Sequence, residues 1–367
     1  METIVEQREG KQDPALRSGQ GRSDDGLPPM NTSGVWVRVA ATVGAAVWAG
    51  MAVLARMGIA RVGAIELLFL FAPLVIVPLG MELGRVIGGV GRLEELARRV
   101  QPLGAAMAVV AIWLPPGRKA GATALAWLGV CLLMAGGGVV RVVGALWGNA
   151  GGGLSASRSP ATHSSVSHSP QTRATLITLG VAQIDLAVGG AWLVASRLGM
   201  RPMGIQEPIG LLTAVHFHFA GFAAATIAAA TLGLAERCGV YGWLKTVVLV
   251  VVGMPYVVAA GFVISPALKM GAAVLFSAGV AGLAIAVHGS GRRAEDGVAR
   301  VLLQIAGTAV FAGMVLSAVY AIADFRGSDA LTIPQMARTH GILNAFGFCL
   351  AGLLGWLVEN SARRSSE

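Results

Sequence analysis

The chain has 367 residues, of which 55% are hydrophobic and only 13% are charged, and its mean hydropathy is +0.69. This composition excludes a soluble globular enzyme and is typical of an integral membrane protein, so the lipid bilayer is its first expected partner. The net charge of +9 does not indicate nucleic-acid binding. Lysines and arginines border the apolar runs, as the positive-inside rule describes, and no basic patch with interleaved aromatic residues occurs.

A bilayer core requires about 20 apolar residues per helix. Runs of this kind predict an all-α, polytopic transmembrane bundle of about ten spans, at residues 35–55, 62–81, 100–114, 120–147, 174–196, 209–234, 243–264, 267–288, 299–322 and 336–358. The charged segment between the second and third spans is expected to form a short amphipathic helix at the membrane interface, near residues 91–100. The three cysteines stand apart and show neither a disulfide framework nor a zinc-site spacing.

Polar segments divide the chain into membrane parts and connecting parts. The expected order is a disordered cytoplasmic tail at 1–34, a four-span part at 35–148, a flexible cytoplasmic linker at 149–173, a six-span part at 174–358 and a polar tail at 359–367. The linker assignment depends on its glycine, serine and proline content, which offers no apolar face for packing.

An even number of spans places both termini on one side of the membrane. Of the 28 lysines and arginines, 19 fall on the side of the termini and 9 on the other side. Because short cytoplasmic loops are enriched in basic residues, we expect cytoplasmic termini in the cell (plasma) membrane.

The most informative stretch is residues 213–222, where His216 and His218 lie inside an apolar run. Ionisable groups within spans are costly and often functional, and Glu66, Asp185 and His340 are further examples. With cytoplasmic termini, the second, sixth and tenth spans run inward. The glutamate and the three histidines then lie in the outer half of the membrane, whereas the aspartate lies near its midplane.

Helical geometry limits how these groups can combine. His216 and His218 differ by about 200° around a regular helix, so we expect one to be functional and the other to pack against or bond a neighbour. In the tenth span, His340 and Asn344 share a face with a stripe of small residues, which permits close helix approach. We therefore predict that Glu66, His340, Asn344 and at least one of the two other histidines line one outer cavity.

Three segments of the chain resemble the YndJ-like family of bacterial multi-pass membrane proteins. They are the second span with its Glu66, residues 216–222 of the sixth span, and residues 339–347 of the tenth. The resemblance covers about residues 35–358, and some members of that family are described as transporters. It implies no catalytic residue and no particular substrate.

Three functions remain open from the residues. A transporter or permease would use Glu66, Asp185 and the histidines to bind a small-molecule or ion substrate or to relay protons. A haem or transition-metal protein would use His216 or His218 with His340 as ligands. A membrane enzyme would use histidine and glutamate as acid and base. Alternatively, these groups only bond helices together.

Transport requires the fewest special assumptions and is the favoured reading. No inverted repeat relates the two parts of the chain, which counts against one common transporter design. A hydrolase would carry a nucleophile motif or an HExxH-type metal motif, and neither occurs. The sequence therefore favours a transporter over an enzyme.

Overall fold

The computed structural model describes residues 32–60, 62–147, 173–239, 242–328 and 331–366. Almost all of the predicted linker and of the predicted N-terminal tail lies outside these residues. Within them the chain is helical without strands, which confirms the predicted helical bundle. The uninterrupted helices are α1 (Thr32–Arg56), α4 (Arg92–Trp113), α5 (Arg118–Trp147), α6 (Arg173–Leu198), α9 (Gly242–Ile264), α10 (Pro266–Arg292) and α11 (Gly297–Phe325).

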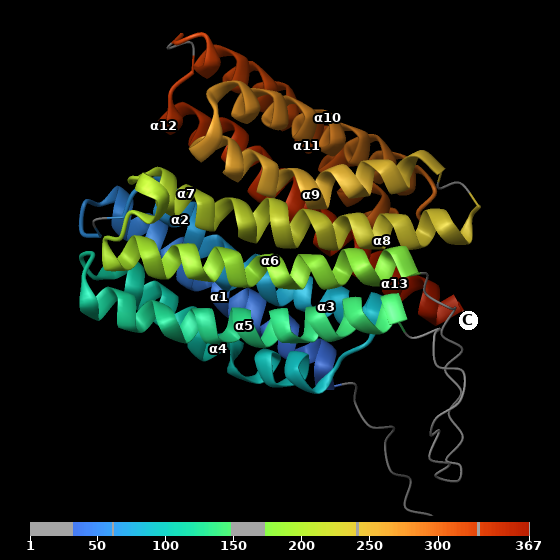
Figure 1. The fold of residues 1–367 in the computed structure, drawn as a ribbon. Helices are drawn as coiled ribbons and strands as arrows, with labels where there is room; N and C mark the ends of the chain where they lie inside the picture. Colours follow the sequence, from blue (N-terminus) through green and yellow to red (C-terminus); the bar gives the residue numbers. More distant parts are fainter. Residues whose placement is uncertain (1–31, 61, 148–172, 240–241, 329–330, 367) are drawn as a thin grey trace, which may run out of the picture.

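Three further spans are each built from several helical pieces. They are α2–η1–α3 (Ala64–Phe71, Ala72–Ile76, Val77–Gly88), α7–η3–α8 (Ile209–His216, Phe217–Ala223, Ala224–Arg237) and α12–η4–η5–α13 (Ile333–Met336, Ala337–Gly341, Leu343–Leu350, Ala351–Ser366). A short 3-10 turn, η2 (Pro202–Gly204), lies in the loop before α7. Figure 1 shows the long helices lying side by side, with the first residues of α2, α7 and α12 at the same end of the bundle.

Nine of the described helical rods are long and apolar enough to cross a membrane, and α4 is a tenth long helix that carries more charge. The prediction of a separate interfacial helix near residues 91–100 was wrong. Residues 92–113 form one continuous helix, which begins after Gly91 with Glu94 capping its first turn. The charged residues of its first turns are accommodated because several of them pair inside the bundle, and such pairing lowers the cost of burying a charge.

The three interrupted spans meet in the centre of the bundle. Each contains a π-helical segment, and η1, η3 and η5 contact one another. A π-helical turn leaves its hydrogen-bonding pattern irregular and occurs frequently at functional sites. Gln101 of α4 compensates part of this irregularity in η1, because its side-chain Nε2 donates a 2.7 Å hydrogen bond to the carbonyl of Pro73.

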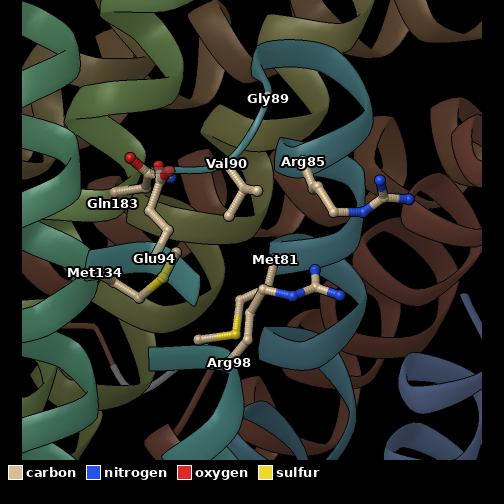
Figure 2. Close-up of a pocket in the computed structure, with 8 residues that line it drawn as sticks. All are labelled: Met81, Arg85, Gly89, Val90, Glu94, Arg98, Met134 and Gln183. Carbon is tan, nitrogen blue, oxygen red and sulfur yellow. The ribbon is translucent and has the colours of Figure 1, made fainter. Parts of the chain in front are cut away.

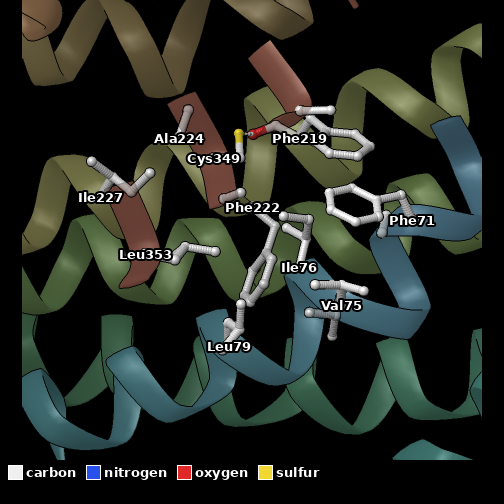
Figure 3. Close-up of a cluster of buried hydrophobic side chains, with 14 of the residues drawn as sticks. Phe71, Val75, Ile76, Leu79, Phe219, Phe222, Ala224, Ile227, Cys349 and Leu353 are labelled. Atoms are coloured by element: carbon white, nitrogen blue, oxygen red, sulfur yellow. Dashed lines mark hydrogen bonds between the residues drawn. The ribbon is translucent and has the colours of Figure 1, made fainter. Parts of the chain in front are cut away.

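Aromatic and aliphatic side chains fill the space between these segments (Figure 3). Phe71 of α2 stacks on Phe346 of η5 with ring centroids 4.3 Å apart, and Trp48 of α1 packs edge-on against both rings. Phe222 of η3 lies against Gly80 of α3, where a Cβ would come within 2.5 Å of the phenyl ring. The core therefore joins spans from distant parts of the sequence.

Candidate functional site

Glu66 lies at the start of the second span and caps its own helix. The backbone amide of Gly63 donates a 3.1 Å hydrogen bond to its Oε2. The carboxylates of Glu66 and Glu207 both lie close enough to Arg197, at the end of α6, for their charges to interact with its guanidinium. Glu66 therefore lies at the end of the bundle where α2 begins and α6 ends.

His216, His340 and Asn344 lie where the sixth and tenth spans begin. His216 is exposed and its Nδ1 bonds the carbonyl of Leu212 at 2.7 Å, whereas Nδ1 of half-buried His340 bonds the carbonyl of Gly313 at 2.9 Å. Asn344 donates a 2.7 Å hydrogen bond to the backbone carbonyl of His340. The two imidazoles are close enough to interact electrostatically, and each keeps Nε2 uncommitted among the described contacts.

His218 is fully buried and makes a hydrogen bond through each ring nitrogen. Its Nδ1 bonds the carbonyl of Ala214 at 2.7 Å, and its Nε2 accepts a 2.9 Å bond from the indole N–H of Trp127 in α5. A neutral imidazole has one donor and one acceptor, so both are used. Of the two neighbouring histidines, His218 is thus the one that bonds a neighbouring helix and His216 is the one left open.

Asp185 occupies the middle of α6, with 12 residues before it and 13 after it in the helix (185 − 173 and 198 − 185). Its side chain is fully buried, and one carboxylate oxygen, Oδ1, accepts a hydrogen bond from the hydroxyl of Tyr256 in α9. The other oxygen, Oδ2, has no hydrogen-bond partner. Among the described residues no basic side chain forms an ion pair with it.

The unpartnered oxygen of Asp185 points at the π-helical segment η3. A Cβ added to Gly221 would lie 2.9 Å from Oδ2, so only a glycine leaves this approach open. On the same face of η3, a Cβ at Gly189 of α6 would come within 2.6 Å of the His218 ring. The carboxyl in the middle of α6 is therefore packed directly against an irregular helix.

The six residues singled out from the sequence fall into separate places. His216, His340 and Asn344 gather near the beginnings of two spans, Glu66 lies close enough to Arg197 for their charges to interact, and Asp185 and His218 lie further along the bundle on either side of the α6–η3 contact. In the part of the chain that the structure describes, no hydrogen bond joins one of these side chains to another. The shared outer cavity stays a prediction.

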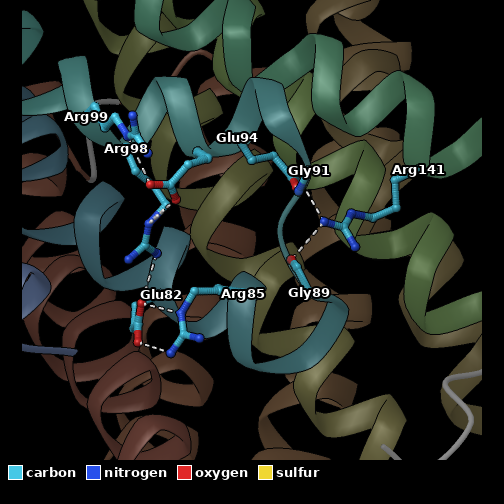
Figure 4. A network of polar contacts seen from close by, with 9 residues as sticks. Glu82, Arg85, Gly89, Gly91, Glu94, Arg98, Arg99 and Arg141 are labelled. Atoms are coloured by element: carbon cyan, nitrogen blue, oxygen red, sulfur yellow. Dashed lines mark hydrogen bonds and ion pairs between the residues drawn. The ribbon is translucent and has the colours of Figure 1, made fainter. Parts of the chain in front are cut away.

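A buried charge network at the opposite end of the bundle was missed by the sequence analysis. Glu82 of α3 accepts hydrogen bonds from Arg85 at 3.0 and 2.6 Å and from Arg98 of α4 at 2.9 Å (Figure 4). Arg98 is 5% exposed and its guanidinium lies 5.1 Å from the ring centre of Trp36 in α1. The spacing of Glu82 and Arg85 could have indicated this ion pair, because side chains three residues apart share a helix face.

A second part of this network fixes the connection between α3 and α4. Glu94 accepts hydrogen bonds from Arg141 of α5, from the backbone of Gly91, and from Gln183 of α6 at 2.6 Å. Arg141 also donates a 2.5 Å hydrogen bond to the carbonyl of Gly88 and a 3.2 Å hydrogen bond to the carbonyl of Gly89, the second of which is drawn in Figure 4. Nothing in the linear sequence pairs these residues, because they come from three helices.

A small pocket lies between the two parts of the network (Figure 2). It is lined by side chains from α3, α4, α5 and α6 and by the loop between α3 and α4: Met81, Arg85, Gly89, Val90, Glu94, Arg98, Met134 and Gln183. Figure 2 shows the guanidinium groups of Arg85 and Arg98 extending to one side, with Glu94 and Gln183 on the other. Gln183 is 3% exposed and its Oε1 has no hydrogen-bond partner.

The histidines do not assemble a metal-ligand set of the usual size. Across the described ranges, no group of three or more His, Cys, Asp or Glu side chains lies close enough together to hold a metal ion. Of the three histidines that the sequence offered as ligands, His218 has both nitrogens bonded to protein partners, whereas His216 and His340 each have an Nε2 without a hydrogen bond among the described residues.

Comparison with known proteins decides the family. The model of YndJ-like proteins matches residues 67–348, which include the interrupted second span after its first three residues, the whole sixth span, Asp185 and the polar network. The chain belongs to the YndJ-like family. The similarity therefore extends from the second span to the π-helical segment of the tenth.

A curated relative supports the same assignment. The "Uncharacterized membrane protein YndJ" of Bacillus subtilis (strain 168) is 32% identical over 180 residues, which are 48% of this chain and 32% of the relative. The match thus spans about a third of the length of that relative. No solved structure matches the chain.

Proposed function

We propose that this integral membrane protein is a transporter for a small molecule or ion, and that Asp185 is its proton-accepting residue. The observation that carries the proposal is the carboxyl in the middle of α6, fully buried, with one oxygen bonded to Tyr256 and the other unpartnered. An unpaired carboxylate in a membrane interior is expensive, so such groups commonly mark ion or proton pathways. A protonation change at this position would add or remove a donor facing η3.

The π-helical segments η1, η3 and η5 support the proposal by supplying elements that could move. Discontinuous helices near the bilayer midplane form the binding sites of many secondary transporters. Here η1, η3 and η5 contact one another, and Asp185 packs on η3. A change at the carboxyl could therefore bias the packing of the interrupted spans, which is what alternating access requires.

Chemical accessibility tests this proposal without knowledge of the substrate. In sealed vesicles, a water-soluble carbodiimide with an isotopically labelled amine is added to one side or the other, and modification of Asp185 is read by peptide mass spectrometry. A transporter exposes its central site to each side in turn, so we expect modification from both sides. Modification from neither side would identify a static structural carboxyl, and modification from one side alone would also contradict alternating access.

We further propose that the termini are cytoplasmic and that the protein resides in the plasma membrane. Of the 28 lysines and arginines, 19 fall on the side of the termini and 9 on the other side, which supports this orientation. The end of the bundle that holds the α3–α4 loop and the C-terminus would then face the cytoplasm.

Native Cys238 offers a direct test of this orientation. It is exposed at the end of α8, whereas Cys131 and Cys349 are buried. We expect a membrane-impermeant maleimide to label Cys238 only after cells are permeabilised. A Met203→Cys variant is the matched control, because Met203 is 65% exposed in the loop at the opposite end and should be labelled in intact cells. Labelling of Cys238 in intact cells would show that the orientation is opposite to the one proposed.

A further inference from the structure

The pocket beneath the α3–α4 loop contains more positive than negative charge. Around it, the carboxylates of Glu82 and Glu94 face the guanidinium groups of Arg85, Arg98 and Arg141. Glu95 also lies nearby, 3.8 Å from Arg98, and it pairs with the exposed Arg99. Counting Glu95 and Arg99 adds one charge of each sign, so the excess of positive charge is unchanged. A net positive charge among buried groups favours an anionic ligand.

Arg85 and Arg98 have hydrogen-bond donors available for a ligand. Both oxygens of Glu94 already accept hydrogen bonds, Oε1 from Arg141 and Gln183 and Oε2 from the backbone of Gly91. Glu82 accepts three bonds from two arginines, using one nitrogen of Arg98 and two of Arg85. A guanidinium has five N–H donors, so both arginines retain unused donors beside the pocket.

The location of these donors suits a group at the membrane surface. The pocket is bordered by the α3–α4 loop, where Val90 is 45% exposed, and the side chain of Arg85 is 24% exposed. Trp36 covers one face of the Arg98 guanidinium. Tryptophan is enriched at membrane interfaces, and basic pockets between transmembrane helices bind anionic headgroups.

We propose that this pocket is a binding site for a phosphate group, held by Arg85 and Arg98. Arginine's planar fork matches phosphate oxygens, and two such forks border the same pocket. The enclosed part has room for about one water molecule, so the phosphate binds at its mouth. Gln183, whose Oε1 lacks a protein partner, accepts a hydrogen bond there from such a water or from a headgroup hydroxyl.

Two sources could supply this phosphate, an anionic phospholipid or a soluble phosphate, and reconstitution separates them. The full-length protein is placed in phosphatidylcholine nanodiscs with or without phosphatidylglycerol, and retained lipid is counted by native mass spectrometry. In parallel, inorganic phosphate is added to protein in pure phosphatidylcholine, and the thermal unfolding midpoint is measured. Selective retention of phosphatidylglycerol identifies the lipid, whereas stabilisation by inorganic phosphate identifies the soluble anion.

Two matched arginine variants locate the site. Arg85→Gln leaves Glu82 paired with Arg98, and it is expected to weaken retention of phosphatidylglycerol, or the response to phosphate, about fivefold. Arg99→Gln removes the same charge from α4, but Arg99 is 73% exposed and does not line the pocket, so it should behave as the wild type. The proposal is overturned if the wild type responds to neither phosphate source. It is equally overturned if both variants lose the response alike, since that would show a diffuse surface-charge effect.

Discussion

Replacing Asp185 with asparagine is expected to slow solute-driven proton movement severely. Asparagine keeps the size and can still accept a hydrogen bond from Tyr256, but it cannot bind and release a proton. Loss of a positioned proton acceptor should reduce the rate by about a hundredfold. The measurement uses proteoliposomes that contain a pH-sensitive dye and are exposed in turn to amino acids, sugars, organic acids and inorganic ions.

Asp324→Asn is the matched control for this prediction. Asp324 pairs with Lys269 at 2.8 Å near a helix end, and its side chain is 36% exposed, so the same chemical change there should leave proton movement nearly unaltered. Equal rates for wild type and Asp185→Asn would contradict the assignment of this carboxyl. If no solute moved protons through the wild type, proton coupling itself would be refuted.

Gly44→Ala is expected to destabilise the protein strongly, although alanine is the better helix former. A Cβ at this position of α1 would lie 1.9 Å from the backbone carbonyl oxygen of Leu74 in η1. Because a backbone atom cannot rotate away as a flexible side chain can, α1 or η1 must shift. Overpacking of this kind costs about 1–3 kcal/mol, which exceeds the gain in helix propensity of about 1 kcal/mol. The measurement is the unfolding transition in mixed micelles as the fraction of denaturing detergent rises.

Gly50→Ala in the same helix is the control that separates the effect of packing on stability from the effect of helix propensity. No atom lies within 4 Å of a Cβ built at Gly50, so this substitution should leave stability unchanged or raise it slightly. If Gly44→Ala were as stable as Gly50→Ala, the close approach of α1 to η1 would be absent in the membrane.

The sequence by itself determined the class of protein and most of its spans. Long apolar runs must form helices in a bilayer, because every backbone polar group needs a partner within its own segment. This local rule predicted the helical bundle and located the ionisable residues in the second, fifth, sixth and tenth spans. It also predicted that His216 and His218 would differ in role, and their different surroundings follow from helical periodicity.

The tertiary structure decided what each polar group contacts. Composition assigned the charges near residues 82–101 to an interfacial segment, but Glu82, Glu94 and Arg98 are buried because their partners come from other turns and other helices. In the same way, Asp185 meets Tyr256 only because α6 packs beside α9. Hydropathy measures the cost of placing a residue in lipid, whereas burial of a charge depends on a partner that is distant in sequence and near in space.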